Sequence, residues 1–91
     1  MSFSARNKQG ELVPITFLPP TPDMKLSAYS CHVAARPVVR ATRIFGGSRR
    51  QAIGLSRAFL RMLLEDKGFS LVNSRGKPVP WAKLHPAAQN T

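Results

Sequence analysis

The sequence has few acidic residues, almost no cysteine and no long apolar run. Glu and Asp number 4 of 91 residues, against 14 Lys and Arg, which gives a formal net charge of +10. So few carboxylates exclude an acidic mimic of nucleic acid and leave little for carboxylate-based catalysis. A balance this basic predicts an anionic partner: nucleic acid, a nucleoprotein, an acidic protein face or an anionic membrane.

Cys31 is the only cysteine, so the chain has no internal disulfide. With two histidines it provides no ligand set for a structural zinc ion. No apolar run approaches the roughly 20 residues that span a bilayer, and residues 1–10 lack the apolar segment of a secretory signal. We therefore expect a cytoplasmic protein with no metal, no cofactor and no membrane partner, in which Cys31 is a small buried core residue.

Sets of catalytic side chains are also missing. Cys31 and His32 are neighbours on a predicted strand, so they point to opposite faces, and His85 falls in a predicted tail. Glu65 and Asp66 are separated by about 100° on a helix, so they do not converge on one site. We therefore predict that the protein is not an enzyme.

Hydrophobic residues make up 43% of the chain, enough for a modest core. Alternating apolar residues predict strands in the first half. Residues 2–18 are predicted to form a β-hairpin, in which Pro14 lacks an N–H donor and so indicates a sheet edge or a bulge. Residues 19–25 form a proline-rich connector, and residues 26–45 contain two strands.

The helix is the clearest element in the sequence. Residues 48–67 have helical periodicity, Ser48 and Gln51 match a capping box, and Gly68 is placed to end the helix. We expect an apolar stripe on this helix to pack against the sheet. Its members are Ala52, Leu55, Phe59, Met62 and Leu63, widened by Ile53, Leu60 and Leu64.

Residues 69–84 are predicted to hold one or more short strands and a tail anchored by Trp81. The whole chain, residues 1–91, is expected to form a single domain of the α+β class. Its plan is a small, mainly antiparallel β-sheet of about four strands with one long amphipathic α-helix packed on one face. A helix-turn-helix is excluded, because the sequence has only one convincing helix.

The start of the helix is the first candidate binding site. Gly46, Gly47 and Ser48 form a turn whose free N–H groups suit an anion, and Arg49 and Arg50 bring two positive charges to the same end. Such charges oppose the helix macrodipole, at about 0.3–1 kcal/mol each. An anion-binding turn explains this arrangement, and so does a simple strand-to-helix turn with solvated arginines.

One face of the helix is the second candidate. Arg50, Gly54, Arg57 and Arg61 recur at helical spacing, predicted opposite the centre of the apolar stripe. Like charges at this spacing repel, and Gly54 costs about 1 kcal/mol relative to alanine while it lets a phosphate or a partner approach closely. The pattern favours binding. The alternative is a polar solvent face with a glycine required by internal packing.

The third candidate is a distributed set of basic residues. Nine of the 14 cations are arginine, which makes bidentate contacts with phosphate. Arg75 and Lys77 flank Gly76 at a predicted loop tip suited to a phosphate backbone. Arg36 lies in a predicted turn, and Arg40 and Arg43 lie on the predicted strand that follows it. Aromatic residues are few, so a platform for stacking single strands is only a minor alternative.

These features predict a non-enzymatic basic protein that docks electrostatically on nucleic acid or on a ribonucleoprotein complex. In size, charge and coarse plan, across the whole chain, it resembles small phage-encoded inhibitors and is similar in general form to type I anti-CRISPR proteins. The resemblance includes no motif, so no residue role carries over. It implies an inhibitor in the host cell cytoplasm that occupies the nucleic-acid path or the crRNA-proximal surface of its target.

Two other functions fit the same residues. One is a phage or plasmid DNA-binding regulator, and the other is a structural interaction module that binds an acidic protein surface. DNA, RNA and an acidic protein all remain open as the partner. The wide apolar span of the helix, residues 58–64, suits a homodimer as well as the core.

Overall fold

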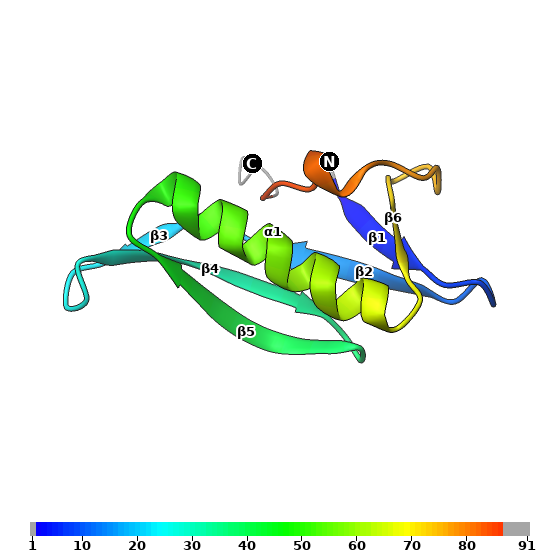
Figure 1. Cartoon of the computed structure of the whole chain (residues 1–91), viewed down its shortest axis with the longest axis horizontal. Helices are drawn as coiled ribbons and strands as arrows, with labels where there is room; N and C mark the ends of the chain where they lie inside the picture. The colour runs from blue at the N-terminus through cyan, green and yellow to red at the C-terminus, as the bar shows by residue number, and fades with distance from the viewer. Residues whose placement is uncertain (1, 87–91) are drawn as a thin grey trace.

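The computed structural model describes residues 2–86, which form a six-stranded antiparallel sheet with one long helix packed across it (Figure 1). The predicted α+β class is confirmed, with two more strands than the predicted four. Along the chain the elements are β1 (Phe3–Arg6), β2 (Leu12–Phe17), β3 (Thr21–Asp23), β4 (Ala28–Ala35), β5 (Val39–Gly46), α1 (Arg49–Asp66), β6 (Ser70–Val72) and the short 3-10 helix η1 (Trp81–Lys83).

Strand β4 organises the sheet. β5 pairs along one of its edges, whereas β3 and the end of β2 share the other edge. β1 then pairs with β2, and β6 pairs with β1, so Ala5 lies opposite Leu71 from the far end of the chain (Figure 1). The hairpin predicted for residues 2–18 is β1–β2, and the strands predicted within residues 26–45 are β4 and β5.

The connector predicted for residues 19–25 contains a strand, which the sequence did not indicate. β3 pairs with the start of β4, and it tolerates Pro22 because an edge strand can lack an N–H donor on its free side. Pro14 lies in β2 before the pairing with β4 begins at Thr16. That part of β2 has a paired strand on one side only, in line with the expectation of an edge or a bulge.

The two ends of α1 follow the sequence signals. Ser48 is the N-cap, and its Oγ accepts the N–H of Gln51 at 3.1 Å, while Oε1 of Gln51 accepts the N–H of Gly47. At the other end Gly68 has φ +85°, and the N–H groups of Gly68 and Phe69 each donate at 2.9 Å to carbonyls of the last helical turn. The predicted bounds of the helix are therefore confirmed to within one residue.

The buried face of α1 differs from the predicted stripe. Its four fully buried residues are spaced four positions apart: Ala52, Ser56, Leu60 and Leu64. Leu55 and Met62, which were predicted to be buried, are 46% and 61% exposed, and Phe59 and Leu63 lie partly buried at the border. The buried face therefore lies about a quarter turn from the predicted one. It includes Ser56, whose burial is tolerated because its hydroxyl donates to the Ala52 carbonyl at 2.7 Å.

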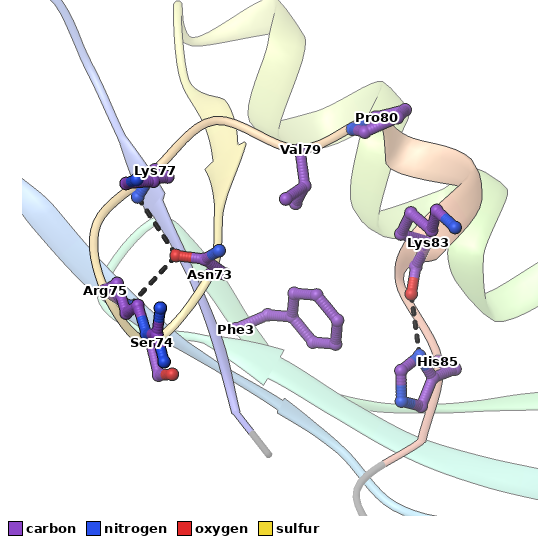
Figure 2. A pocket seen from close by; sticks show the side chains of 9 residues that line it. All are labelled: Phe3, Asn73, Ser74, Arg75, Lys77, Val79, Pro80, Lys83 and His85. Atoms are coloured by element: carbon purple, nitrogen blue, oxygen red, sulfur yellow. Dashed lines mark hydrogen bonds between the residues drawn. The ribbon is translucent and has the colours of Figure 1, made fainter.

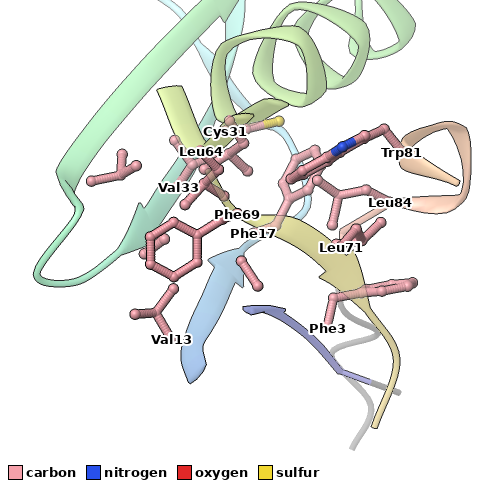
Figure 3. Packing of buried hydrophobic residues seen from close by; sticks show 14 of the residues in the cluster. Phe3, Val13, Phe17, Cys31, Val33, Leu64, Phe69, Leu71, Trp81 and Leu84 are labelled. Atoms are coloured by element: carbon pink, nitrogen blue, oxygen red, sulfur yellow. The ribbon is translucent and has the colours of Figure 1, made fainter. Parts of the chain in front are cut away.

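The core lies between α1 and the sheet and continues beneath the C-terminal segment (Figure 3). Trp81 and Leu84 pack there with Phe17 and Leu71, so the predicted anchoring role of Trp81 is confirmed. The segment forms the 3-10 helix η1 rather than a second short strand. Cys31, at the centre of β4, is fully buried, as predicted.

A bulge divides β5. The register between β4 and β5 slips by one residue, so Val39 and Ile44 both pack toward the core although an odd number of positions separates them. Arg43 and Phe45 consequently lie on the face away from α1. Simple alternation along residues 38–45 does not allow for the extra residue, so it does not describe the two faces of β5 beyond the bulge.

Candidate functional site

Acidic side chains neutralise few of the basic ones. Arg43 Nη2 lies 3.8 Å from Oδ2 of Asp23, and Arg61 Nε lies 3.1 Å from Oε1 of Glu65, one turn further along α1. Within residues 2–86 the other 12 of the 14 Lys and Arg side chains have no carboxylate within 4.0 Å. The positive charge is therefore directed outward rather than balanced inside the fold.

Arg50, Gly54, Arg57 and Arg61 share one side of α1, which we call the arginine flank. Arg50 and Arg61 are exposed, and Arg57 is half-buried. The sequence predicted that the flank lies opposite the centre of the buried face. Because the buried face is rotated, the flank instead begins next to Leu64, at the border of that face. The flank therefore adjoins the elements that pack against α1 on that side.

Arg57 connects the flank to the C-terminal segment. Its Nε donates a hydrogen bond of 2.7 Å to the backbone carbonyl oxygen of Leu84. This bond uses one of the five N–H donors of the guanidinium group. The charge of Arg57 is thus held in a fixed position beside η1, which lowers the entropy lost when it binds a ligand.

Gly54 has no packing requirement for glycine. A Cβ built at this position meets no atom within 4 Å outside the neighbouring backbone of the helix. Tight internal packing, one of the two explanations left open by the sequence, therefore does not account for Gly54. The residue leaves the helix backbone uncovered between Arg50 and Arg57, about one turn from each.

The start of α1 is a packed corner. A Cβ at Gly46 would lie 2.5 Å from the backbone nitrogen of Ala52, so only glycine fits where β5 turns into the helix. Two N–H groups at this end already have partners within the chain. The N–H of Gly47 donates to Oε1 of Gln51, and the N–H of Gln51 donates to Oγ of Ser48. The turn itself explains these glycines and the serine, and anion binding there stays a prediction.

Three other predicted arginines lie outside the flank. The guanidinium of Arg49 lies 5.2 Å from the ring centroid of Tyr29 and donates at 3.3 Å to a carbonyl of the loop before β3. Arg43 lies 5.0 Å from the ring centroid of Phe45 and close to Asp23. Arg40 is exposed at the bulge of β5. The structure therefore does not bring these residues together with the helix stripe.

A pocket of about 490 Å³ lies between the β6–η1 loop and the C-terminal segment (Figure 2). Three of its lining residues are basic, three are apolar and none is acidic, and we call it the basic pocket. The lining residues are Phe3, Asn73, Ser74, Arg75, Lys77, Val79, Pro80, Lys83 and His85.

Hydrogen bonds fix the shape of the loop beside this pocket. Oδ1 of Asn73 accepts the N–H groups of Arg75 and Lys77 at 2.9 and 3.0 Å. Nη2 of Arg6 donates at 3.0 Å to the carbonyl of Gly76, whose φ of +78° favours glycine. The loop predicted to contact phosphate is therefore held in one conformation, with its two basic residues at the rim.

Of the residues that line the basic pocket, sequence reasoning named only Arg75 and Lys77, and it missed Phe3, Lys83 and His85 among the others. The ring centroids of Phe3 and His85 lie 5.1 Å apart, with an angle of 85° between the rings. No local pattern could indicate this contact, because it joins β1 to the segment after η1. Only the pairing of β1 with β6 brings these distant residues together.

The arginine flank and the basic pocket adjoin each other. Leu84 accepts the hydrogen bond from Arg57, and its chain neighbours Lys83 and His85 line the pocket. Figure 2 shows α1 passing behind η1 at this point. The arginine flank and the basic pocket therefore meet at the C-terminal segment, around Leu84.

Other features of the described chain offer less. A second pocket, of about 680 Å³, includes both Glu11 and Lys67, so its lining is not of one sign. Within residues 2–86 no three His, Cys, Asp or Glu side chains form a metal-binding cluster. No helix in the same range is long and apolar enough to cross a bilayer.

Comparisons with protein-family models, with curated proteins and with solved structures gave no match to this chain. Its function must therefore be argued from its own residues. The strongest arrangement they form is the arginine flank together with the adjoining basic pocket.

Proposed function

We propose that the protein is a non-enzymatic nucleic-acid-binding protein that docks on nucleic acid, free or within a nucleoprotein, through the arginine flank and the adjoining basic pocket. One observation carries the proposal: three arginines at helical spacing enclose a glycine that packing does not require. Repulsion among these arginines, which Glu65 relieves only at Arg61, and the glycine both destabilise α1. A phosphate backbone bound along the flank offsets both effects.

The dimensions of the flank suit a chain of phosphates. A rise of about 1.5 Å per residue separates Arg50 from Arg57 by about 10 Å and Arg57 from Arg61 by about 6 Å. Each guanidinium can contact two phosphate oxygens, and Gly54 allows close approach between the first two arginines. Contacts of this kind position a nucleic acid without reading its bases, so we expect little sequence preference.

Inhibition of a host nucleoprotein is one use of such a surface. The resemblance to anti-CRISPR proteins implies occupation of a nucleic-acid path, and a competitor of this kind needs a fixed array of cations and no catalytic group. A DNA-binding regulator would use the same array. Both functions share one measurable step, the binding of a phosphate backbone.

Fluorescence anisotropy with labelled RNA and DNA tests this step. The double variant Arg50→Gln/Arg61→Gln removes two flank cations and leaves the Arg57–Leu84 bond intact. The control Lys25→Gln/Arg36→Gln removes the same charge from the turns before and after β4. Between about 50 and 200 mM salt, we expect the flank variant to lower the slope of log affinity against log salt by about 0.7–0.9 for each phosphate that it no longer binds. The control should change this slope little.

Thermal unfolding must first show that both variants are folded. Equal loss of affinity in the two variants would mean that net charge alone drives binding, which contradicts a site on α1. If the wild-type protein bound neither RNA nor DNA, nucleic-acid binding would be excluded, and the interaction module for an acidic protein surface would replace it.

A further inference from the structure

The basic pocket combines an apolar floor with cations on two sides, which is more than a phosphate backbone requires. We propose that it binds one unpaired base of a single-stranded nucleic acid, together with the phosphates on either side of that nucleotide. The inference rests on the proposed function and specifies which form of nucleic acid the surface prefers.

The cations are arranged as a nucleotide within a strand needs them. Arg75 and Lys77 lie on one side of Phe3, and Lys83 lies on the other, as Figure 2 shows. A nucleotide in a strand carries a phosphate on both sides of its sugar, so the base enters between the two groups of cations. Asn73 holds the loop residues in place before any ligand arrives.

The floor and one wall of the pocket suit a base. His85 is exposed, and its ring meets the ring of Phe3 edge-on at 5.1 Å. Its Nδ1 lies 2.7 Å from the carbonyl oxygen of Lys83. Because a carbonyl only accepts, Nδ1 donates, and Nε2 and the ring face are left for a ligand. Histidine is among the side chains on which unpaired bases stack, and the largely buried Phe3 contributes an apolar floor.

Size and chemistry favour a nucleotide over simpler ligands. A volume of about 490 Å³ falls within the range of about 300–1,000 Å³ that is usual for small-molecule sites. A free phosphate would contact the cations but leave the apolar surface of Phe3 and Val79 unused. A base paired in a duplex cannot enter the pocket, so an unpaired nucleotide fits best.

Binding of a single strand and of its duplex provides the first test. Labelled RNA and DNA strands of mixed sequence are each compared with the corresponding duplex by anisotropy. We expect the wild-type protein to bind the single strand about tenfold more tightly, the size of effect expected when one base stacks. Arg75→Gln/Lys83→Gln should abolish this preference, whereas the control Lys25→Gln/Arg36→Gln, with the same loss of charge, should retain it.

Nuclear magnetic resonance with small probes tests the base directly. Adenosine 5′-monophosphate should shift the ring signals of His85 and Phe3, whereas inorganic phosphate should shift only signals of the β6–η1 loop. His85→Ala changes an exposed side chain, so the fold should persist. We expect it to weaken binding of the mononucleotide about tenfold and to leave phosphate binding unchanged.

The outcomes separate this inference from the proposed function. Equal affinity for single strand and duplex, with no effect of His85→Ala on the mononucleotide, would overturn the inference while nucleic-acid binding by the flank still stood. If the wild-type protein bound no oligonucleotide, the proposed function would fail. In that case, a change in the ring signals of His85 on addition of the mononucleotide would still support the binding of a nucleotide in the pocket. The lack of any such change would overturn the inference.

Discussion

Nε of Arg57 donates a 2.7 Å hydrogen bond to the backbone carbonyl oxygen of Leu84. The bond joins the middle of α1 to the segment that closes the core, since the side chain of Leu84 is fully buried. Arg57 also belongs to the arginine flank. One side chain therefore contributes to the stability of the fold and to the proposed binding surface.

Replacement of Arg57 should show how much this side chain contributes to the stability of the fold. We expect Arg57→Ala to lower the free energy of unfolding by about 1–3 kcal/mol, because it removes a hydrogen bond made by a charged group. Urea denaturation followed by Trp81 fluorescence measures the loss next to η1. Arg50→Ala, on the exposed part of the flank, should stay within about 0.5 kcal/mol of the wild type. Equal values for the two variants would show that the Arg57–Leu84 bond adds no stability.

Two leucines of α1 distinguish the observed buried face from the predicted one. Leu60→Ala should lower the free energy of unfolding by about 2–5 kcal/mol, because it leaves a cavity in the core. Leu55→Ala should lower it by less than about 1 kcal/mol, since Leu55 is 46% exposed. Chemical denaturation of both variants gives the two values. A larger loss for Leu55→Ala would restore the predicted stripe.

Gly54→Ala should raise stability and weaken binding at the same time. The added methyl group meets open space, so the gain should be about 0.5–1 kcal/mol, the difference in helix propensity. If a phosphate backbone approaches α1 at this point, the methyl group obstructs it, and affinity for nucleic acid falls severalfold. Denaturation and anisotropy on the same preparation test both effects. Unchanged affinity would show that Gly54 is not a point of close approach.

Cys31 should make stability depend on pH in the alkaline range. Burial raises the pKa of its thiol, and the neighbouring Ser56 hydroxyl offsets part of the rise. The folded state then keeps the thiol proton to a higher pH than the unfolded state does. This contribution to stability is complete below about pH 9 and is lost as the pH rises through the folded-state value.

We therefore expect the free energy of unfolding of the wild type to fall more steeply above about pH 9 than that of Cys31→Ala. Denaturation curves at a series of pH values give the difference between the two proteins. The two proteins differ only at residue 31, so the difference between their profiles isolates the thiol. Parallel pH profiles would contradict the effect of burial on the thiol.

Local signals were enough to predict the local structure. The cap at Ser48 and the glycine at Gly68 determine where α1 begins and ends, because both act within one helical turn. Contacts between distant segments decided the rest. β3 exists because β4 offers residues 21–23 an edge to pair with. The buried face of α1 includes Ser56, and the periodicity of apolar residues gives no indication that a serine is buried.

The candidate site likewise has one part that local sequence signals predicted and another that depends on contacts between distant segments. The spacing of Arg50, Arg57 and Arg61 is a property of one helix, so the sequence alone predicted their alignment. Their position beside η1 depends on the bond to Leu84. The contact between Phe3 and His85 depends on the pairing of β1 with β6. Neither relationship leaves a pattern in the sequence.

Strand β1 lies between β2, its neighbour in sequence, and β6, which follows α1. The floor of the basic pocket comes from β1, the first strand, and its rim comes from segments that follow β6, the last strand. Contacts between distant segments form late in folding, because closure of a long loop costs entropy. On the ribosome, the arginine flank can form once α1 packs on β4 and β5, whereas the pocket must await η1. Local opening of the three-residue strand β6 would dismantle the pocket and spare the flank. The arginine flank and the basic pocket should therefore show different protection in hydrogen exchange.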